Sequence, residues 1–168
     1  MPVQRLNHAV LYVRDVDRSV AFYTEALGFR VVTSIPGRAA FLQAADSTND
    51  HDLGLFAIGS RAGDSTAGHS TVGLYHLAWE VDTLAELQRI RDVLTERGSL
   101  VGASDHGSTK ALYAKDPDGI EFEVSWLVPA ALLDPKEAIT TQPLHLDREI
   151  ERYGAETRGG IGVSVPSA

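Results

Sequence analysis

The pattern of apolar and polar residues divides the chain into two similar halves. In the first half, residues 6–15 ("LNHAVLYVRD") predict a strand, and residues 16–28 place Val20, Tyr23 and Leu27 on one face of a helix. Three short apolar stretches bounded by polar or glycine-containing segments predict three more strands, at residues 29–35, 39–45 and 51–59.

The second half repeats this order. Residues 73–81 ("GLYHLAWEV") predict a strand, and residues 83–98 predict a helix with Leu84, Leu87 and Leu94 on or near one stripe. Three further strands are expected at residues 100–104, 110–115 and 120–126, with a turn in the "DPDG" segment at 116–119.

Residues with strong capping preferences bracket both helices. Asp15 or Asp17 can cap the first helix, and Gly28 suits its end. Thr83 has capping-box spacing to Glu86 in the second helix, and Gly98 is expected to end that helix.

We therefore predict an α+β fold in which two repeated βαβββ modules form a curved mixed-sheet cleft. The modules should span residues 1–60 and 73–127. Residues 61–72, rich in Gly, Ser and Thr, are expected to link them. Residues 128–168 should form a C-terminal extension that is partly disordered, with a short helix at "PLHLDREIERYG".

Composition excludes several classes of function. A formal net charge of -8 argues against nucleic acid or an anionic membrane as a partner. No apolar run approaches the roughly 18 residues of a membrane helix, and the N-terminus lacks a signal core, so a cytoplasmic protein is expected. The absence of cysteine excludes disulfides and thiolate metal sites, so any metal must take nitrogen and oxygen ligands.

Two histidines occupy matching places in the repeat. His8 and His76 each lie in the first predicted strand of a half, although a lone histidine in such a strand is usually a core residue. A shared ligand role gives both a reason to occupy that place. Glu123 is the preferred third ligand because it lies deep in a strand, where an unpaired carboxylate is costly, whereas Glu121 lies beside the turn and is expected to be solvated. Two histidines and one carboxylate form the facial triad of non-haem Fe(II) oxygenases.

The sequence resembles the vicinal oxygen chelate superfamily, which includes glyoxalase I, bleomycin-resistance proteins and extradiol dioxygenases. The resemblance rests on residues 7–29, 73–81 and 116–126, and it covers about residues 5 to 127. The last segment is similar to the family's "DPDG" ending, although Ile120 replaces the usual Asn. The resemblance implies a metal site in the cleft, with His8, His76 and Glu123 as its ligands.

Within the superfamily, the chain is most similar to small extradiol dioxygenases of the catechol 2,3-dioxygenase type. "HDLGLF" resembles the strand that carries their acid/base histidine, and "SDHGSTKALY" resembles a segment with a second histidine and a tyrosine. The resemblance implies catalytic roles for His51, His106 and Tyr113. It further implies Fe(II), with Mn(II) satisfying the same ligands, and a catechol-type diol and O2 as substrates.

Rival interpretations remain open at this stage. A glyoxalase-like enzyme would need a fourth ligand, an inward Glu or Gln in the last strand of the first half, and residues 51–59 contain neither. A fosfomycin-type thiol transferase would use the same three ligands but would not need His51 or Tyr113. A non-enzymatic binding protein of the bleomycin-resistance kind would lack the metal ligands. We also expect a homodimer or larger assembly, because the apolar start of the extension at "LVPAALLDP" has little reason to exist on a compact pair of modules.

Overall fold

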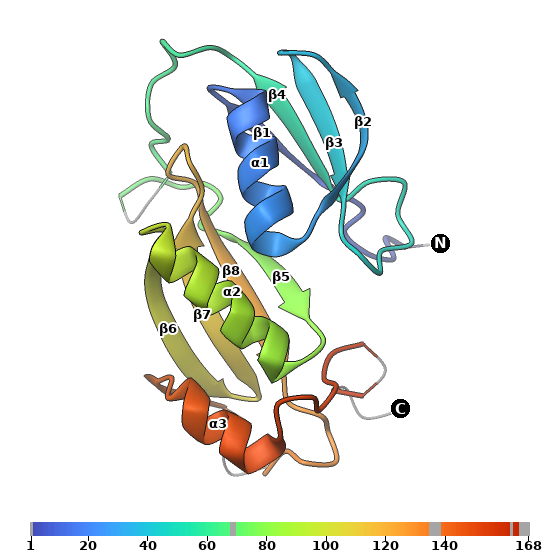
Figure 1. Cartoon of the computed structure of the whole chain (residues 1–168), viewed down its shortest axis with the longest axis vertical. Helices are drawn as coiled ribbons and strands as arrows, with labels where there is room; N and C mark the ends of the chain where they lie inside the picture. Colours follow the sequence, from blue (N-terminus) through green and yellow to red (C-terminus); the bar gives the residue numbers. More distant parts are fainter. Residues whose placement is uncertain (1, 68–69, 135–138, 162, 165–168) are drawn as a thin grey trace. The chain divides into compact units, whose positions relative to one another are not determined.

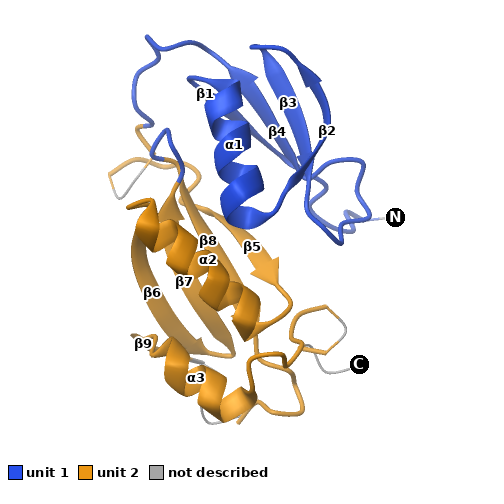
Figure 2. Ribbon diagram, viewed as in Figure 1, with its two compact units in different colours: residues 1–65, 116–119 blue, residues 66–115, 120–168 orange. Residues whose placement is uncertain are grey.

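The computed structural model of the chain describes residues 2–67, 70–134, 139–161 and 163–164. The chain forms two compact units, residues 1–65 with 116–119 (unit 1) and residues 66–115 with 120–168 (unit 2; Figure 2). Parts of the expected linker, with His69, and of the expected C-terminal extension lie outside the described residues. Within the described part of the chain, no helix is long and apolar enough to cross a membrane.

Unit 1 is a four-stranded sheet with one helix on it (Figure 1). Its strands lie in the order β1-β4-β3-β2, with β1 parallel to β4 and the other neighbours antiparallel. Its elements, in chain order, are β1 (Ala9–Val13), α1 (Val16–Leu27), β2 (Arg30–Ile35), β3 (Ala39–Gln43) and β4 (Leu53–Ala57).

Unit 2 repeats this topology and adds a strand and a helix. Its strands lie in the order β5-β8-β7-β6-β9, with β5 parallel to β8 and the other neighbours antiparallel. Its elements, in chain order, are β5 (Leu77–Val81), α2 (Leu84–Glu96), β6 (Leu100–Gly107), β7 (Thr109–Lys115), β8 (Glu121–Leu127), β9 (Ile139–Pro143) and α3 (Leu146–Tyr153). The predicted α+β fold with its βαβββ repeat is confirmed, and so is the short helix of the extension.

Strand β9 was not expected from the sequence. Its residues, Ile139–Pro143, include three polar side chains and a proline, so they carry no apolar alternation of their own. They form a strand because they pair with the edge of β6, as in the match of Ser104 with Pro143. Pro143 stands at the end of β9, where the missing N–H costs little. Strand β6 is also longer than predicted and reaches Gly107.

The helix caps follow the sequence closely. Asp15 accepts hydrogen bonds from the backbone N–H groups of Asp17 and Arg18, and Gly28 ends α1 with a φ of 73°. Thr83 accepts from the Glu86 N–H as predicted. The Glu86 carboxylate, however, binds Arg89 at 2.6 Å instead of completing a capping box.

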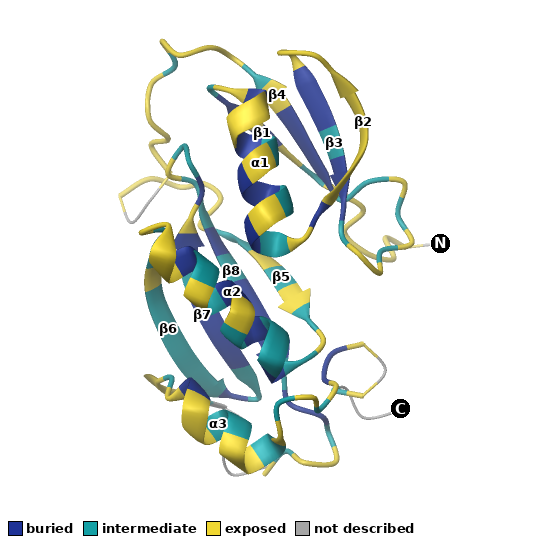
Figure 3. Cartoon of the chain, viewed as in Figure 1, coloured by how far each residue is buried: buried dark blue, intermediate teal, exposed yellow. Residues whose placement is uncertain are grey.

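Helices α1 and α2 each bury an apolar stripe against one face of their own sheet (Figure 3). In unit 2, Leu87 and Leu94 of α2 are fully buried, as are Leu112 of β7 and Trp126 of β8. Because successive strand residues point to opposite faces, the alternate residues lie on the other face of each sheet, which we call the open face. In unit 1 the open face carries Val10 and Tyr12, 51% and 70% exposed.

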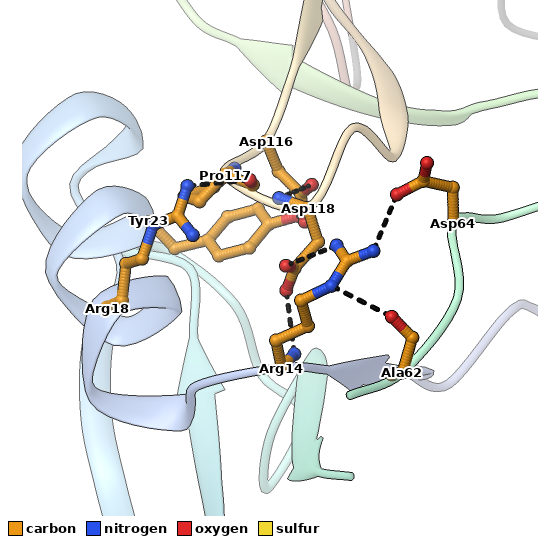
Figure 4. Close-up of polar contacts among 8 residues, drawn as sticks. All are labelled: Arg14, Arg18, Tyr23, Ala62, Asp64, Asp116, Pro117 and Asp118. Atoms are coloured by element: carbon orange, nitrogen blue, oxygen red, sulfur yellow. Dashed lines mark hydrogen bonds and ion pairs between the residues drawn. The ribbon is translucent and has the colours of Figure 1, made fainter. Parts of the chain in front are cut away.

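The "DPDG" turn between β7 and β8 belongs to unit 1 and is held there by Arg14, which follows β1, and by Tyr23 of α1 (Figure 4). Asp118 accepts from the Arg14 backbone N–H at 2.9 Å and from the Arg14 guanidinium at 3.0 Å. The Tyr23 hydroxyl donates to Asp116 at 3.2 Å, and both side chains are buried. Burial, followed by the negative charge of Asp116, raises the pKa of Tyr23 well above its ordinary value, so Tyr23 remains a donor.

We expect Tyr23→Phe to lower the free energy of unfolding by about 1–3 kcal/mol, because the buried Asp116 carboxylate loses a hydrogen-bond donor. Urea denaturation measures the change. The matched control is Tyr12→Phe, which removes a hydroxyl from a tyrosine that is 70% exposed and should change the value by less than about 0.5 kcal/mol. Equal effects of the two variants would contradict the role given to Asp116.

Candidate functional site

His8 and His76 occupy equivalent places in the two units. His8 directly precedes Ala9, the first residue of β1, and His76 directly precedes Leu77, the first residue of β5. The predicted strands began earlier, so both histidines lie at strand starts and not inside strands. Their equivalence in the repeat holds, because β1 and β5 occupy the same place in the two sheets.

In unit 1, His8 lies against His51. The two ring centroids are 4.5 Å apart, and the His51 ring meets Phe41 edge-on at 5.1 Å. Phe41 in turn contacts Phe56 at 5.7 Å. Unit 1 therefore places two imidazoles next to an aromatic surface that Phe41 and Phe56 form.

The loop before β4 holds His51 in place through its neighbour Asp52. The Asp52 carboxylate accepts from the Ser47 hydroxyl at 2.7 Å and from the Ala44 N–H at 2.8 Å. Asn49 donates to the same carboxylate and to the backbone carbonyl of Asn7, each at 2.7 Å. The loop is therefore fastened to the residue that precedes His8.

Asp50 is a partner of His51 that the sequence interpretation missed. Its carboxylate lies 3.1 Å from His51 Nδ1. A hydrogen bond from the His51 backbone N–H lowers the pKa of Asp50, so this carboxylate remains charged beside the ring. An acid on one ring nitrogen orients the imidazole and leaves the other nitrogen free for proton transfer. The acid directly before His51 in the sequence was the available signal.

In unit 2, His76 and Glu123 form a close pair. His76 Nε2 lies 3.3 Å from a Glu123 carboxylate oxygen, and the side chains are 23% and 13% exposed. Two neighbouring ligands, each about 2.1 Å from one metal ion, would be separated by roughly 3 Å, so the pair fits a divalent cation. With Nε2 facing Glu123, the second ring nitrogen of His76 is Nδ1. A histidine that binds a metal usually donates a hydrogen bond from its second nitrogen. Nδ1 of His76 is buried and has no such partner among the described residues.

Tyr113 and His106 lie next to the His76–Glu123 pair on neighbouring strands of the same sheet. Tyr113 is matched with Glu123 in the antiparallel pairing of β7 and β8, and its ring centroid lies 5.8 Å from that of His76. His106 Nε2 lies 2.9 Å from the Tyr113 hydroxyl. Burial, followed by the charge and hydrogen bond of Glu123, raises the pKa of Tyr113 to about 12. Tyr113 is therefore a neutral phenol beside Glu123.

Glu121 has a different neighbour. The charge of Glu121 and a hydrogen bond to it raise the pKa of Tyr75, whose ring lies 4.5 Å from His76. The two acids of β8 thus act on the pKa values of different tyrosines, and it is Glu123 that faces His76.

The structure brings together His8 with His51 in unit 1, and His76, Glu123, Tyr113 and His106 in unit 2. Among the residues that the structure describes, no group of three or more His, Asp or Glu side chains is arranged to hold a metal ion. The three-ligand site with His8, His76 and Glu123 therefore stays a prediction.

A family model described as Glyoxalase/Bleomycin resistance protein/Dioxygenase superfamily matches residues 5–124. The chain belongs to this superfamily. The solved glyoxylase/bleomycin resistance protein/dioxygenase domain from Frankia sp. EAN1pec has a TM-score of 0.61, with 21% identity over 77% of this chain and 96% of that one. The superfamily and its fold, both expected from the sequence, are thus confirmed.

Curated relatives in the superfamily carry different activities. The chain is 30% identical over 120 residues to a catechol-2,3-dioxygenase of Bacillus subtilis, a match that covers 71% of this chain and 40% of that protein. It is 31% identical over 131 residues to a lactoylglutathione lyase of Salmonella typhimurium, covering 71% of this chain and 90% of that enzyme. The chain thus matches less than half of the dioxygenase and almost all of the lyase.

We expect Glu123→Gln to lower the pKa of Tyr113 in the metal-free protein from about 12 toward its ordinary value of 10, because the variant removes the charge next to the phenol. Burial would still keep the pKa of Tyr113 above 10. Alkaline absorbance titration, with Tyr113→Phe as the reference, measures this value. Glu121→Gln is the control and should act mainly on the pKa of Tyr75. An unchanged pKa of Tyr113 in Glu123→Gln would refute the contact.

Proposed function

We propose that the chain is a metal-dependent extradiol dioxygenase that opens the ring of a catechol-type aromatic with O2. The observation that carries the proposal is the Asp50–His51 pair beside His8, at 3.1 Å and 4.5 Å respectively. Ring cleavage requires a positioned acid/base group next to the metal, which the rival activities in this fold do not require of His51. The similarity to a catechol-2,3-dioxygenase supports the same choice.

We propose His8, His76 and Glu123 as the metal ligands. The 3.3 Å separation of His76 from Glu123 supports this assignment for two of them. Two neutral imidazoles and one carboxylate suit Fe(II), and Mn(II) fits the same set. The bound ion would hold the diol and dioxygen in contact and accept electron density from the ring.

His51 is the proposed acid/base. An imidazole ordinarily titrates close to neutral pH, so it can take a proton from the diol and return it later in the reaction. Because the Asp50 carboxylate lies beside Nδ1, Nε2 is the nitrogen of His51 that would transfer the proton. The edge of Phe41, 5.1 Å from the His51 ring, provides an apolar surface on which an aromatic substrate can pack.

Tyr113 and His106 are the proposed hydrogen-bonding groups on the other unit. Because the raised pKa of Tyr113, about 12, keeps the phenol protonated, Tyr113 can donate to a substrate oxygen when Glu123 takes up its role as a ligand. Nε2 of His106 lies 2.9 Å from the Tyr113 hydroxyl and helps to hold this phenol in position.

A glyoxalase-like activity is the second candidate, because the lactoylglutathione lyase matches this chain at similar identity and over more of its own length. Its fourth ligand is the difficulty, since β4, Leu53–Ala57, contains no Glu or Gln. A thiol transferase with the same three ligands is a third. Oxygen uptake with a panel of catechols, set against thiol-dependent turnover, distinguishes these enzymes.

A homodimer is also part of the proposal. The exposed Val10 and Tyr12 on the open face of unit 1 support an apolar contact with a second copy. The apolar start of the extension gives weaker support for a dimer, because it packs within unit 2, where Val128 is 1% exposed.

We expect His76→Ala to abolish stoichiometric binding of Fe(II) after anaerobic reconstitution, because it removes one of the ligands. Metal analysis of the desalted protein measures the occupancy. Glu123→Gln should behave in the same way, and Glu121→Gln should bind one ion per chain like the unaltered protein. Full metal occupancy in His76→Ala would refute the ligand assignment, and loss only in Glu121→Gln would show that the wrong acid was chosen.

We expect His51→Ala to retain iron and catechol binding but to lower kcat for ring opening by about 10²- to 10⁴-fold, the range for loss of one positioned acid/base group. The effect should appear in kcat, because the group acts after the substrate has bound. His145→Ala, at the exposed start of α3, is the control and should turn over normally. Unchanged turnover in His51→Ala at full iron occupancy would remove the catalytic role.

A further inference from the structure

The C-terminal extension forms a pocket with β6 on the face of the strand that is turned away from His106. The pocket has a volume of about 240 Å³, and Asp105 and Gly107 of β6 line it together with residues of β9 and α3 (Figure 2). The side chain of His106, between those two residues, instead lies 2.9 Å from the Tyr113 hydroxyl. Because successive strand residues point to opposite faces, the pocket is separate from the side chains that the proposed function uses.

Two arginines of α3 line this pocket from one side of the helix. Arg148 and Arg152 are four residues apart, so they are neighbours on the same helix face. Among the residues that the structure describes, Arg148 has no ion-pair partner, and the Arg152 guanidinium lies 4.9 Å from the centroid of the Tyr153 ring. Guanidinium groups present planar sets of N–H donors that match the oxygens of a carboxylate or phosphate. Two of them on one helix face therefore favour an oxyanion.

Strand β9 supplies uncharged polar groups to the same pocket. Thr140 and Gln142 line it and, because they are two residues apart in a strand, they point to the same face. Gln142 is matched with Asp105 in the pairing of β9 with β6. A hydroxyl and a carboxamide can each donate or accept a hydrogen bond, so these two residues suit the polar remainder of a bound molecule.

The two acids that line the pocket share a buried lysine. Asp105 and Glu149 lie 2.5 Å and 3.1 Å from Lys110 Nζ, and the Lys110 side chain is 2% exposed. Lys110, Arg148 and Arg152 together carry three positive charges against two carboxylates, which leaves one net positive charge. A ligand with a single negative charge is therefore attracted on the arginine side, whereas the two carboxylates repel a second negative charge.

We propose that this pocket is a second ligand site, which binds a small organic monocarboxylate through Arg148 and Arg152, with Thr140 and Gln142 in contact with the rest of the molecule. Its volume of about 240 Å³ has room for more than a bare inorganic ion. Its β9 and α3 residues lie outside the segment matched by the family model, residues 5–124. The site is therefore a property of the extension, and it depends neither on a bound metal nor on the proposed function.

An NMR titration of the metal-free, full-length protein with lactate tests the site. Propane-1,2-diol, in which a hydroxymethyl group replaces the carboxylate of lactate, is the uncharged control. We expect lactate to cause saturable shifts of the backbone amide signals of β9 and α3, with a Kd in the millimolar range that is usual for so small a ligand. The diol should cause none. Inorganic phosphate, a dianion at mildly alkaline pH, should bind more weakly than lactate.

Three variants locate the binding. Arg148→Gln and Arg152→Gln should each raise the Kd for lactate about tenfold or more, because each removes a charge-assisted hydrogen bond. Arg89→Gln is the matched control, since it also removes one positive charge from unit 2, but at a position on α2 where Arg89 pairs with Glu86 at 2.6 Å outside the pocket. It should leave the Kd unchanged. Urea denaturation checks that all three variants fold.

Several results would overturn the proposal. The absence of saturable shifts with lactate, or equal shifts with propane-1,2-diol, would show that the pocket does not bind a carboxylate. Tighter binding of phosphate than of lactate would refute the choice of a monocarboxylate and assign the pocket to phosphate compounds. An equal rise of the Kd in Arg89→Gln and Arg148→Gln would reduce the effect to the overall charge of unit 2.

Discussion

Each sheet in this protein can be covered by its own helix on one face only, and this constraint organises everything else. Helices α1 and α2 bury their leucines and aromatic residues against every second strand residue, including Leu11, Leu112 and Trp126. The intervening residues face away from the helix, so these positions can carry polar side chains without disrupting the core. His76, Glu123 and Tyr113 contact one another in this way, while the residues beside them in the chain, such as Phe122 and Leu112, form the core.

The two units present different polar side chains on the same topology. Unit 1 presents His8 and His51 over aromatic rings, with Asp50 setting the orientation of His51. Unit 2 presents the His76–Glu123 pair and the neutral phenol of Tyr113, which is matched with Glu123 across β7 and β8. The repeat of one fold has thus placed an imidazole pair over aromatic rings on one unit and an imidazole–carboxylate pair beside a phenol on the other.

Buried charges join the C-terminal extension to the rest of unit 2. Lys110 would be costly to bury alone, because an unpaired ammonium loses its hydration. Asp105 and Glu149 offset this cost from β6 and from α3. The α3 carboxylate therefore joins the extension to the hairpin that carries His106 and Tyr113. The extension is as much a part of unit 2 as the strands of the repeat.

Much of the candidate site followed from local pattern and from the repeat. The apolar periodicities determined both modules and both helices, since helix stripes and strand alternation are properties of neighbouring residues. The caps at Asp15 and Thr83 formed as expected for the same reason. The equivalence of His8 and His76 was visible because it depends on order along the chain.

Other features depended on contacts between distant segments. Strand β9 exists through its pairing with β6, and Thr141 faces His106 across 35 positions in the sequence. Likewise, the choice of Tyr113 and not Tyr75 as the partner of Glu123 was settled by the cross-strand register of β7 and β8. Local sequence determines the strands of the two repeated modules, the helices and their caps. Only the folded sheets decide which polar side chains meet, because hydrogen bonds across strands depend on register and on bulges that no short stretch of sequence encodes.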